Sequence, residues 1–278
     1  MNFCHFEAIR IQKLLRSHGL SPVHSQGQNF LVDLDLARHI VTLSGIGPSD
    51  RVVEIGPGLG SLTRPLLEKT GRLWCVERDS RLVPLLRQTA EGLGELHIIT
   101  GDALHQDYQA LADRLGGPLR VVANLPYQIS SPLLLHFLEQ RRAFQTLTLM
   151  FQKEVAHRLA ASPGNKEYGT LSVYCQLWSR VEVVLEVPPT AFHPVPKVNS
   201  AVVHMTLQEQ PTVLVSDPAA LTRVVRAAFG QRRKTLTNAL KGLSTDVPAW
   251  LLRANIDGQR RGETLTLDEF ARLVATGD

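Results

Sequence analysis

The chain has 278 residues, of which 44% are hydrophobic and 20% are charged, a composition typical of a globular protein of one or two domains. Its 30 basic and 26 acidic side chains leave a formal net charge of +4, which permits a polyanionic partner without requiring one. The cysteines Cys4, Cys75 and Cys175 are scattered and lack zinc-site spacing, so we expect no metal and a reducing compartment.

No apolar run approaches the ~20 residues that cross a membrane. The N-terminal segment carries Glu7, Arg10, Lys13 and Arg16, which is unlike a secretory signal. We therefore expect a cytoplasmic protein without a membrane partner, and we take a monomer as the default oligomeric state.

Strand-like and helical patterns alternate along most of the chain. A short amphipathic helix around Phe6–Leu15 precedes a polar loop and a helix over 33–43. Strands are then predicted over 51–55, 72–76, 97–100, 119–123 and 146–151, and helices over 61–68, 80–91 and 131–140. Strands separated by helices imply right-handed crossovers and a mainly parallel, Rossmann-like α/β sheet.

The pattern changes toward the C-terminus. Segments 181–187 and 200–207 have no helical pattern between them and predict an antiparallel hairpin at one sheet edge. A linker over 208–215 is followed by helical patterns over 218–229, 234–241, 248–254 and 267–275. We therefore predict an α/β domain over 1–207 and a small all-helical domain over 208–278.

Glycines follow the first strand of the alternating region. Gly56, Gly58 and Gly60 have the spacing Gly-x-Gly-x-Gly, which differs from that of a dinucleotide-binding loop but lets backbone approach a ligand closely. A tight turn without a ligand is the alternative. Because carboxyl ends of parallel strands form ligand sites, we interpret Gly56 and Gly58 as cofactor-binding residues.

Two acidic residues end the next predicted strands. Glu77 follows Gly56 by 21 residues, the position at which an acid binds the ribose hydroxyls of a nucleotide, with Asp79 as the neighbouring competitor. Asp102 ends the third strand, where its carboxylate can accept a hydrogen bond from an adenine amine or cap a helix.

Asn124-Leu125-Pro126-Tyr127 ends the fourth strand. The lone pair of an adenine N6 amine is delocalised into the ring, so the amine needs acceptors that hold both its hydrogens. The Asn124 side chain and the Pro126 carbonyl are the predicted acceptors, and Tyr127 offers a face on which a flipped base stacks. A packed turn is the alternative interpretation.

Phe192-His193-Pro194-Val195-Pro196-Lys197-Val198 connects the two hairpin strands. Prolines stiffen this connector, so Phe192 either stacks on the opposite face of the base or anchors the loop. Lys197 is predicted to lie near a phosphate.

The helical region contains a basic run without an acid. Arg223, Arg226, Arg232, Arg233, Lys234 and Lys241 suit phosphate contacts, although a solvated face is the usual meaning of such a run. In one continuous helix, all except Arg232 would share a face, and Gly230 is placed to interrupt that helix.

These motifs together resemble the ribosomal RNA adenine dimethyltransferases of the small subunit, the kasugamycin-resistance type. The resemblance covers about residues 20–275 and rests on Gly27-Gln28-Asn29-Phe30-Leu31, the Gly56 loop, Val76-Glu77, Gly101-Asp102-Ala103, Asn124 to Tyr127, Phe192 to Val198, and Arg232-Arg233-Lys234.

The resemblance implies a class I S-adenosylmethionine-dependent methyltransferase fold with a helical C-terminal domain. It implies dimethylation of N6 in two adjacent adenosines of a hairpin near the 3′ end of small-subunit rRNA, within the immature small subunit. Asn29 and Leu31 join the expected cofactor site only through this resemblance. His24-Ser25-Gln26 replace the basic residues common in the family, and Gln128 replaces an asparagine.

Two alternatives remain at this point. A large-subunit rRNA adenine methyltransferase commonly carries isoleucine where this chain has Leu125. A non-catalytic RNA-binding assembly factor is disfavoured because Gly56, Glu77, Asp102 and Asn124 are all retained. A DNA adenine methyltransferase is less consistent with the tetrapeptide.

Overall fold

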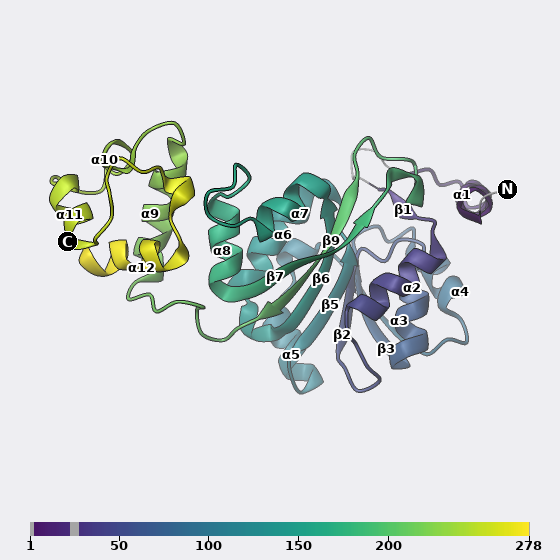
Figure 1. Cartoon of the computed structure of the whole chain (residues 1–278). Helices are drawn as coiled ribbons and strands as arrows, with labels where there is room; N and C mark the ends of the chain where they lie inside the picture. The colour runs from purple at the N-terminus through teal and green to yellow at the C-terminus, as the bar shows by residue number, and fades with distance from the viewer. Residues whose placement is uncertain (1–2, 23–27, 278) are drawn as a thin grey trace. The chain divides into compact units, whose positions relative to one another are not determined.

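The computed structural model describes residues 3–22 and 28–277 (Figure 1). These residues pack into two compact units. The sheet unit comprises Met1–Ala156 and Glu182–Leu207, and the helical unit comprises His157–Val181 and Gln208–Asp278. No helix of the described part is long and apolar enough to cross a membrane.

A seven-stranded sheet of order β4-β3-β2-β5-β6-β9-β7 organises the sheet unit. β2 to β6 are parallel and β9 is antiparallel to β6, so the predicted mainly parallel sheet is confirmed. The strands are β2 (Val52–Ile55), β3 (Arg72–Glu77), β4 (Glu95–Thr100), β5 (Leu119–Asn124), β6 (Phe144–Gln152), β7 (Ser179–Val187) and β9 (Ser200–Leu207). The two expected C-terminal strands therefore lie at one end of the sheet.

Helices cover both faces of the sheet, as right-handed crossovers require. The chain moves outward from β2 to β4, so the crossovers that lead to β3 and β4 fall on one face of the sheet. It then returns to β5 and β6 on the other side of β2, so those crossovers fall on the opposite face (Figure 1). The helices of this unit are α1 (Phe3–Ser17), α2 (Leu34–Leu43), α3 (Thr63–Thr70), α4 (Val83–Ala90), α5 (Tyr108–Leu115) and α6 (Tyr127–Glu139). α5 was not expected from the sequence.

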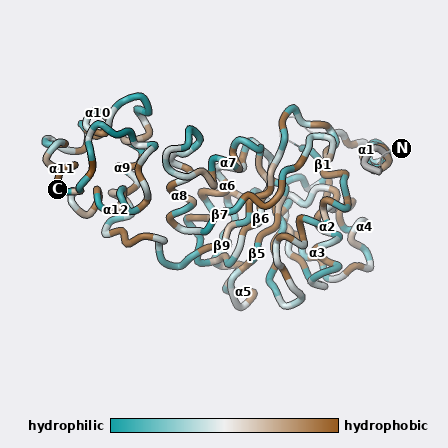
Figure 2. The backbone as a smooth tube through the Cα atoms, viewed as in Figure 1, coloured by the Kyte–Doolittle hydropathy of each residue, from teal (hydrophilic) through white to brown (hydrophobic). Residues whose placement is uncertain are grey.

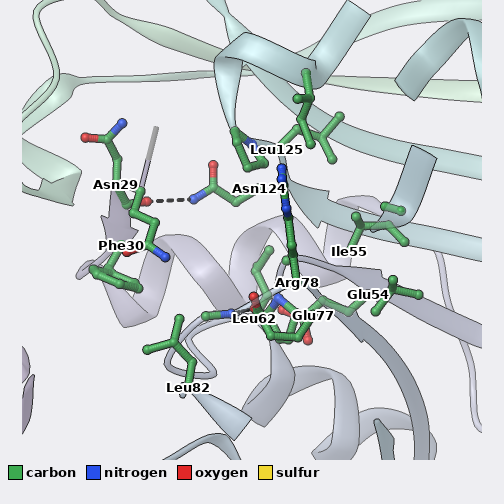
Figure 3. Close-up of a pocket in the computed structure, with 18 of the residues that line it drawn as sticks. Asn29, Phe30, Glu54, Ile55, Leu62, Glu77, Arg78, Leu82, Asn124 and Leu125 are labelled. Atoms are coloured by element: carbon green, nitrogen blue, oxygen red, sulfur yellow. Dashed lines mark hydrogen bonds between the residues drawn. The ribbon is translucent and has the colours of Figure 1, made fainter. Parts of the chain in front are cut away.

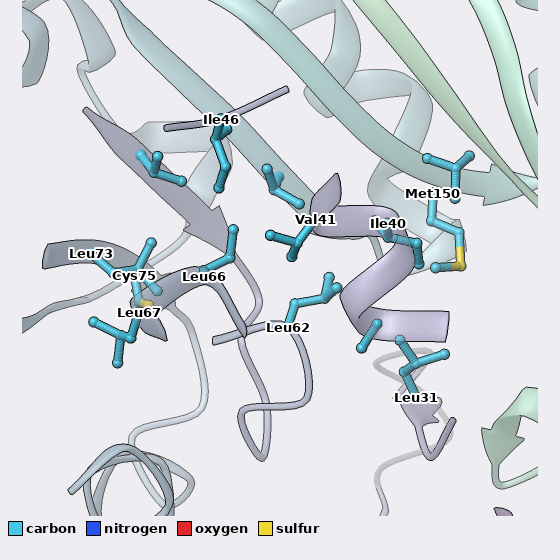
Figure 4. Packing of buried hydrophobic residues seen from close by; sticks show 14 of the residues in the cluster. Leu31, Ile40, Val41, Ile46, Leu62, Leu66, Leu67, Leu73, Cys75 and Met150 are labelled. Atoms are coloured by element: carbon cyan, nitrogen blue, oxygen red, sulfur yellow. The ribbon is translucent and has the colours of Figure 1, made fainter. Parts of the chain in front are cut away.

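The core between α2, α3 and the sheet explains why three of the four residues of β2 are apolar, with Glu54 as the exception. All residues of β2 are buried, and Leu66, Leu67 and Leu73 are fully enclosed (Figure 4). Each such leucine contributes roughly 1.5–3 kcal/mol by leaving water. Hydrophobic segments of the chain accordingly gather along the sheet and the helix faces turned toward it (Figure 2).

Short elements connect this core to the ends of the strands. β1 (Phe30–Leu31) and β8 (Phe192–His193) form a separate antiparallel pair, which joins two segments far apart in the sequence. Short 3-10 turns precede α5 at Ala103–His105, β6 at Arg141–Ala143 and β8 at Pro189–Ala191.

Helix starts follow the predicted capping chemistry. The Asp33 carboxylate accepts from the Leu36 N–H at 2.9 Å, and Asp217 caps two N–H groups at the start of its helix. Thr266 and Glu269 form a reciprocal capping box. The expected starts at Asp217-Pro218 and Thr266 are thereby confirmed.

The helical unit contains α9 (Pro218–Gly230), α10 (Leu236–Ala239), α11 (Val247–Arg253) and α12 (Leu267–Thr276). It also includes α8 (Thr170–Trp178), whose Val173 and Leu177 share a core with α9 and α12. The unit division therefore differs from the predicted one at 157–181, a segment whose apolar side chains pack on the C-terminal helices. α7 (Lys153–Ala160) also precedes β7, and the sequence predicted neither α7 nor α8.

The basic run does not form one helix. α9 ends at Gly230 and α10 begins at Leu236, so the helix is interrupted where Gly230 was placed to interrupt it, and the run shares no single helical face. The turn over 231–234 carries Arg232, Arg233 and Lys234.

A close approach within the helical unit gives the first prediction. A Cβ added at Gly262 would lie 2.8 Å from the Ala228 Cβ and 2.9 Å from its carbonyl oxygen. We expect Gly262→Ala to lower the free energy of unfolding by about 1–3 kcal/mol through overpacking. Urea denaturation measures it. Gly242→Ala is the control, because a Cβ there meets no atom within 4 Å. Equal stability of the two variants would contradict the close packing.

Candidate active site

A cavity of about 260 Å³ lies at the carboxyl ends of the central strands. Its lining includes the loop after β2, the ends of β3 and β5, and the residues after β4. This is the point at which the strand order reverses between β2 and β5, where ligands bind in open α/β sheets. All predicted cofactor residues, Asn29, Leu31, Gly56, Gly58, Glu77, Asp102 and Asn124, line it.

The glycine loop after β2 forms one wall. Gly56 and Gly58 have φ of 62° and 56°, a left-handed conformation that favours glycine. A Cβ on Gly58 would lie 3.1 Å from the Phe30 ring, and the Gly58 N–H donates to a Glu77 carboxylate oxygen at 3.2 Å. The missing side chains therefore let the loop lie between an aromatic ring and a carboxylate.

Glu77 rather than Asp79 faces the cavity. Glu77 as a residue is 6% exposed, its carboxylate also accepts from the Asp79 N–H at 2.7 Å, and burial raises its pKa. The Asp79 carboxylate instead pairs with Arg81 at 2.7 Å, which lowers the Asp79 pKa, and it does not line the cavity. Backbone N–H groups thus orient Glu77 toward a ligand that donates hydrogen bonds.

Asp102 has the capping role that was one of the two considered for it, and its second oxygen stays a candidate acceptor for a ligand amine. One oxygen accepts from the Leu104 N–H at 3.0 Å and caps a 3-10 turn, while the residue lines the cavity. The other oxygen lies 3.7 Å from an Arg78 Nη1 atom. The cap fixes the carboxylate and leaves one oxygen to accept from a ligand amine.

Asn124 is oriented by a hydrogen bond across the cavity. Its Nδ2 donates to the Asn29 carbonyl at 3.1 Å (Figure 3). A backbone carbonyl can only accept, so the amide must present its nitrogen to Asn29, and its Oδ1 remains an acceptor. Asn29 thereby fixes which way the Asn124 side chain faces a substrate amine.

The Pro126 carbonyl is less open than expected. It accepts from the Ile129 N–H at 3.1 Å in the first turn of α6. A carbonyl oxygen has two lone pairs, so one remains available. Leu125 also lines the cavity, so this remaining lone pair and the Leu125 carbonyl are the two candidates for a second acceptor.

Tyr127 lines the cavity and its hydroxyl is held. The hydroxyl shares a 2.6 Å hydrogen bond with the Oγ of Ser200, a fully buried residue at the start of β9. Burial raises the Tyr127 pKa. The ring is thus anchored at its tip, and a neutral phenol at physiological pH makes it a surface for packing rather than a base.

Phe192 and Lys197 are not brought to the cavity. Phe192 is 1% exposed, pairs with Leu31 in the β1–β8 ladder and belongs to the main core. Its ring therefore anchors the loop here, as in the second of the two predicted roles. Lys197 is exposed and does not line the cavity.

The predicted RNA-binding residues of the helical unit differ in their contacts. Arg226, Arg233 and Lys234 are exposed, and their side chains make no hydrogen bond or ion pair to the described residues. Arg232 donates to the carbonyls of Lys166 and Tyr168 at 2.8 and 2.7 Å, so its guanidinium is partly structural. His24-Ser25-Gln26 and Gly27 lie outside the described residues.

Phe30 and Arg78 are among the cavity-lining residues that sequence reasoning did not assign to the site. Phe30 packs on the glycine loop. Its place between Asn29 and Leu31 in the family motif was the signal that could have assigned it to the site. Arg78 borders the cavity beside Asp102, and a charged residue after a strand gave no separate signal (Figure 3). Among the described residues, no group of three or more His, Cys, Asp or Glu side chains is arranged as a metal site.

Comparisons with known proteins agree with this geometry. A family model described as Ribosomal RNA adenine dimethylase matches residues 23–276. The chain belongs to this family. Ribosomal RNA small subunit methyltransferase A of Magnetococcus marinus is 56% identical over 267 residues, 96% of each chain. The protein of the same name from Geobacter sulfurreducens is 48% identical, covering 94% of this chain and 96% of that one.

Solved structures show the same fold. A dimethyladenosine transferase from Plasmodium falciparum matches with a TM-score of 0.71 and 26% identity, covering 87% of this chain and 94% of its own. The 23S rRNA methyltransferase ErmE matches with a TM-score of 0.72 and 25% identity, and the match covers 90% of this chain and 100% of the ErmE chain. The class I S-adenosylmethionine-dependent methyltransferase fold, predicted from the motifs, is confirmed.

The bond between Tyr127 and Ser200 gives a prediction about ring position. Tyr127→Phe and Ser200→Ala each remove one partner, and we expect each to lower kcat about fivefold, equivalent to ~1 kcal/mol. The double variant should be no worse than either single variant, because both act on one interaction. Steady-state methyl transfer measures it. Losses that multiply in the double variant would contradict a shared role.

Buried Glu54 gives a prediction about pH. Burial raises its pKa from 4.5 to about 8, against hydrogen bonds from Thr63 and Cys75 that lower it. Between pH 4.5 and about pH 8, Glu54 is protonated in the folded chain and ionised in the unfolded chain. The free energy of unfolding therefore falls as the pH rises toward about 8 and then becomes constant. Glu54→Gln lacks this dependence, so its stability relative to the parent should grow between about pH 5 and about pH 8.5. Urea denaturation at both pH values tests it, and parallel pH profiles would contradict it.

Proposed function

We propose that this protein dimethylates N6 of two adjacent adenosines in a hairpin near the 3′ end of small-subunit rRNA, with S-adenosylmethionine as the methyl donor. The oriented Asn124 amide at the cavity carries the proposal. Its Oδ1 accepts one N6 hydrogen, since its Nδ2 is committed to Asn29 at 3.1 Å. The proposed setting is the immature small subunit in the cytoplasm, with the enzyme acting as a monomer.

The residues present fit S-adenosylmethionine. The Glu77 carboxylate accepts from the ribose diol, Asp102 accepts from the adenine amine, and Gly56 and Gly58 have no side chains to block the approach of the ligand. When bound, the sulfonium supplies an electrophilic methyl group. The charges fit too, because Glu77 repels an added ribose phosphate, which this ligand lacks.

The chain's own groups prepare the amine. An acceptor at Asn124 and a carbonyl at Pro126 or Leu125 hold both N6 hydrogens and localise the lone pair toward the methyl donor. Tyr127 supplies a face for the flipped base, an interaction worth about 1–3 kcal/mol per base in single-strand recognition. No general base is needed, because the methylated ammonium loses its proton to solvent.

RNA affinity is supported by exposed cations outside the cavity. Lys197, Arg226, Arg233 and Lys234 are exposed and suit phosphate contacts, and Arg232 supports the turn that carries its two neighbours. Phe192 contributes to this function by holding the loop that bears Lys197.

The small subunit is favoured over the large. Relatives named for the small subunit are 48% and 56% identical over nearly the whole chain, whereas the 23S enzyme is 25% identical. Retention of the cavity residues disfavours a purely structural assembly factor.

Asn124→Ala tests the proposal. With small subunits from an unmethylated strain, we expect kcat to fall about 100- to 1000-fold, as for other positioned acceptors and donors in active sites. RNA affinity should be unchanged, because the residue contacts no phosphate. Mass spectrometry of the product RNA gives the methylated site and the number of methyl groups. Incorporation into large-subunit RNA alone, or none by the parent protein, would overturn the proposal.

A further inference from the structure

A second cavity lies at the amino ends of the strands, whereas the active site lies at their carboxyl ends. It has a volume of about 630 Å³ and is bordered by residues at the amino ends of the strands and after α5. Arg51 precedes β2, Arg72 begins β3, Glu95 begins β4, and Arg114 lies in the last turn of α5. The proposed reaction uses none of these residues.

The acids of this cavity are already neutralised. Glu95 pairs with Arg72 at 2.6 Å and with His97 at 3.0 Å. Asp50 accepts from the Gly47 N–H at 2.7 Å and pairs with Arg120 at 3.2 Å. Arg51 and Arg114 therefore have no acidic partner among the described residues, and the cavity carries excess positive charge.

Arg51 is fixed in position rather than mobile. Its Nε donates to the Leu115 carbonyl at 2.6 Å, and a Cβ on Gly117 would lie 3.0 Å from its Nη1. Its terminal nitrogens make no hydrogen bond to the described residues. A guanidinium held at one side presents its remaining N–H donors as a fork, the geometry that binds a phosphate bidentately.

An aromatic stack borders the same cavity. Trp74 lines it and stacks on His97, with ring centroids 4.9 Å apart and planes at 12°. The Arg72 guanidinium lies 6.0 Å from the Trp74 ring. This stack keeps Arg72 and Glu95 together, so Glu95 is not available to neutralise Arg51.

We propose that this cavity binds a phosphate group, with Arg51 and Arg114 as its donors, and that the phosphate belongs to the backbone of the rRNA substrate. The second part rests on the proposed function. The two cavities lie at opposite ends of β3, a strand of six residues, and are therefore about 20 Å apart at ~3.3 Å per residue. A mononucleotide does not reach both cavities, whereas a folded rRNA does, so the site adds affinity for the large substrate only.

Arg114→Gln tests the RNA contact, because this exposed side chain makes no hydrogen bond or ion pair within the described structure. For unmethylated small subunits we expect KM to rise about threefold and the slope of log affinity against log salt to fall by about one. kcat and the Kd for S-adenosylmethionine should not change. Arg87→Gln is the matched control, an exposed arginine of α4 outside both cavities, and should alter neither quantity.

A second arm separates RNA from a free anion as the source of the phosphate. Inorganic phosphate is titrated into the full chain while the indole N–H resonance of Trp74 is followed by NMR. A saturable shift that is lost in Arg114→Gln, together with the KM effect, supports the proposal. A shift without any KM effect would mean that the cavity takes a free anion, and it would overturn the RNA assignment. Neither effect, with the parent enzyme active, would overturn the site while leaving the proposed function intact.

Discussion

The reversal of strand order between β2 and β5 is the constraint on which the active site depends. β3 and β4 lie on one side of β2, and β5 and β6 lie on the other. The connections that leave β2 and β5 therefore run to opposite faces, and the cavity lies between the carboxyl ends of these two strands. Gly56 is the first residue after β2, and Asn124 is the last residue of the adjacent β5. Both therefore line the cavity at this point.

Burial at this gap sets the electrostatics of the site. Glu54 and Glu77 both lie on buried strands, and desolvation raises the pKa of each. Only Glu77 receives backbone N–H groups, from Gly58 and Asp79, and these favour its carboxylate form. Glu54 receives the Thr63 hydroxyl at 2.6 Å instead and stays protonated at neutral pH. The two glutamates thus differ in their partners: backbone N–H groups favour the charged form of Glu77, whereas Glu54 has only side-chain donors.

The sequence predicted the parts of the site that follow from strand ends. Gly56, Glu77, Asp102 and Asn124 each end or follow an apolar run, so periodicity alone placed them on one edge of the sheet. Asn29 required the family resemblance, because its contact with Asn124 joins residues 95 positions apart and has no local pattern.

Tertiary contacts explain what the sequence could not show. Phe192 looks like an exposed aromatic in a proline-rich connector, but its pairing with β1 buries it in the core. The segment 157–181 follows a strand of the sheet, yet Val173 and Leu177 pack with the C-terminal helices. Arg232 belongs to a basic run, and only the nearby carbonyls of Lys166 and Tyr168 distinguish it from its neighbours.

Affinity for RNA and methyl transfer rest on different physical terms in this protein. The proposed chemistry depends on hydrogen bonds in a sheltered cavity, such as that between Asn124 and Asn29, which salt screens little. The proposed RNA contacts are exposed cations, including Arg233 and Lys234, whose contribution to affinity falls as counterions compete. Since the two sets of residues share no member, the proposal places the salt dependence in RNA binding and leaves the geometry of the cavity unaltered. On this proposal, low salt strengthens rRNA binding while each methyl transfer depends on the same few oriented acceptors.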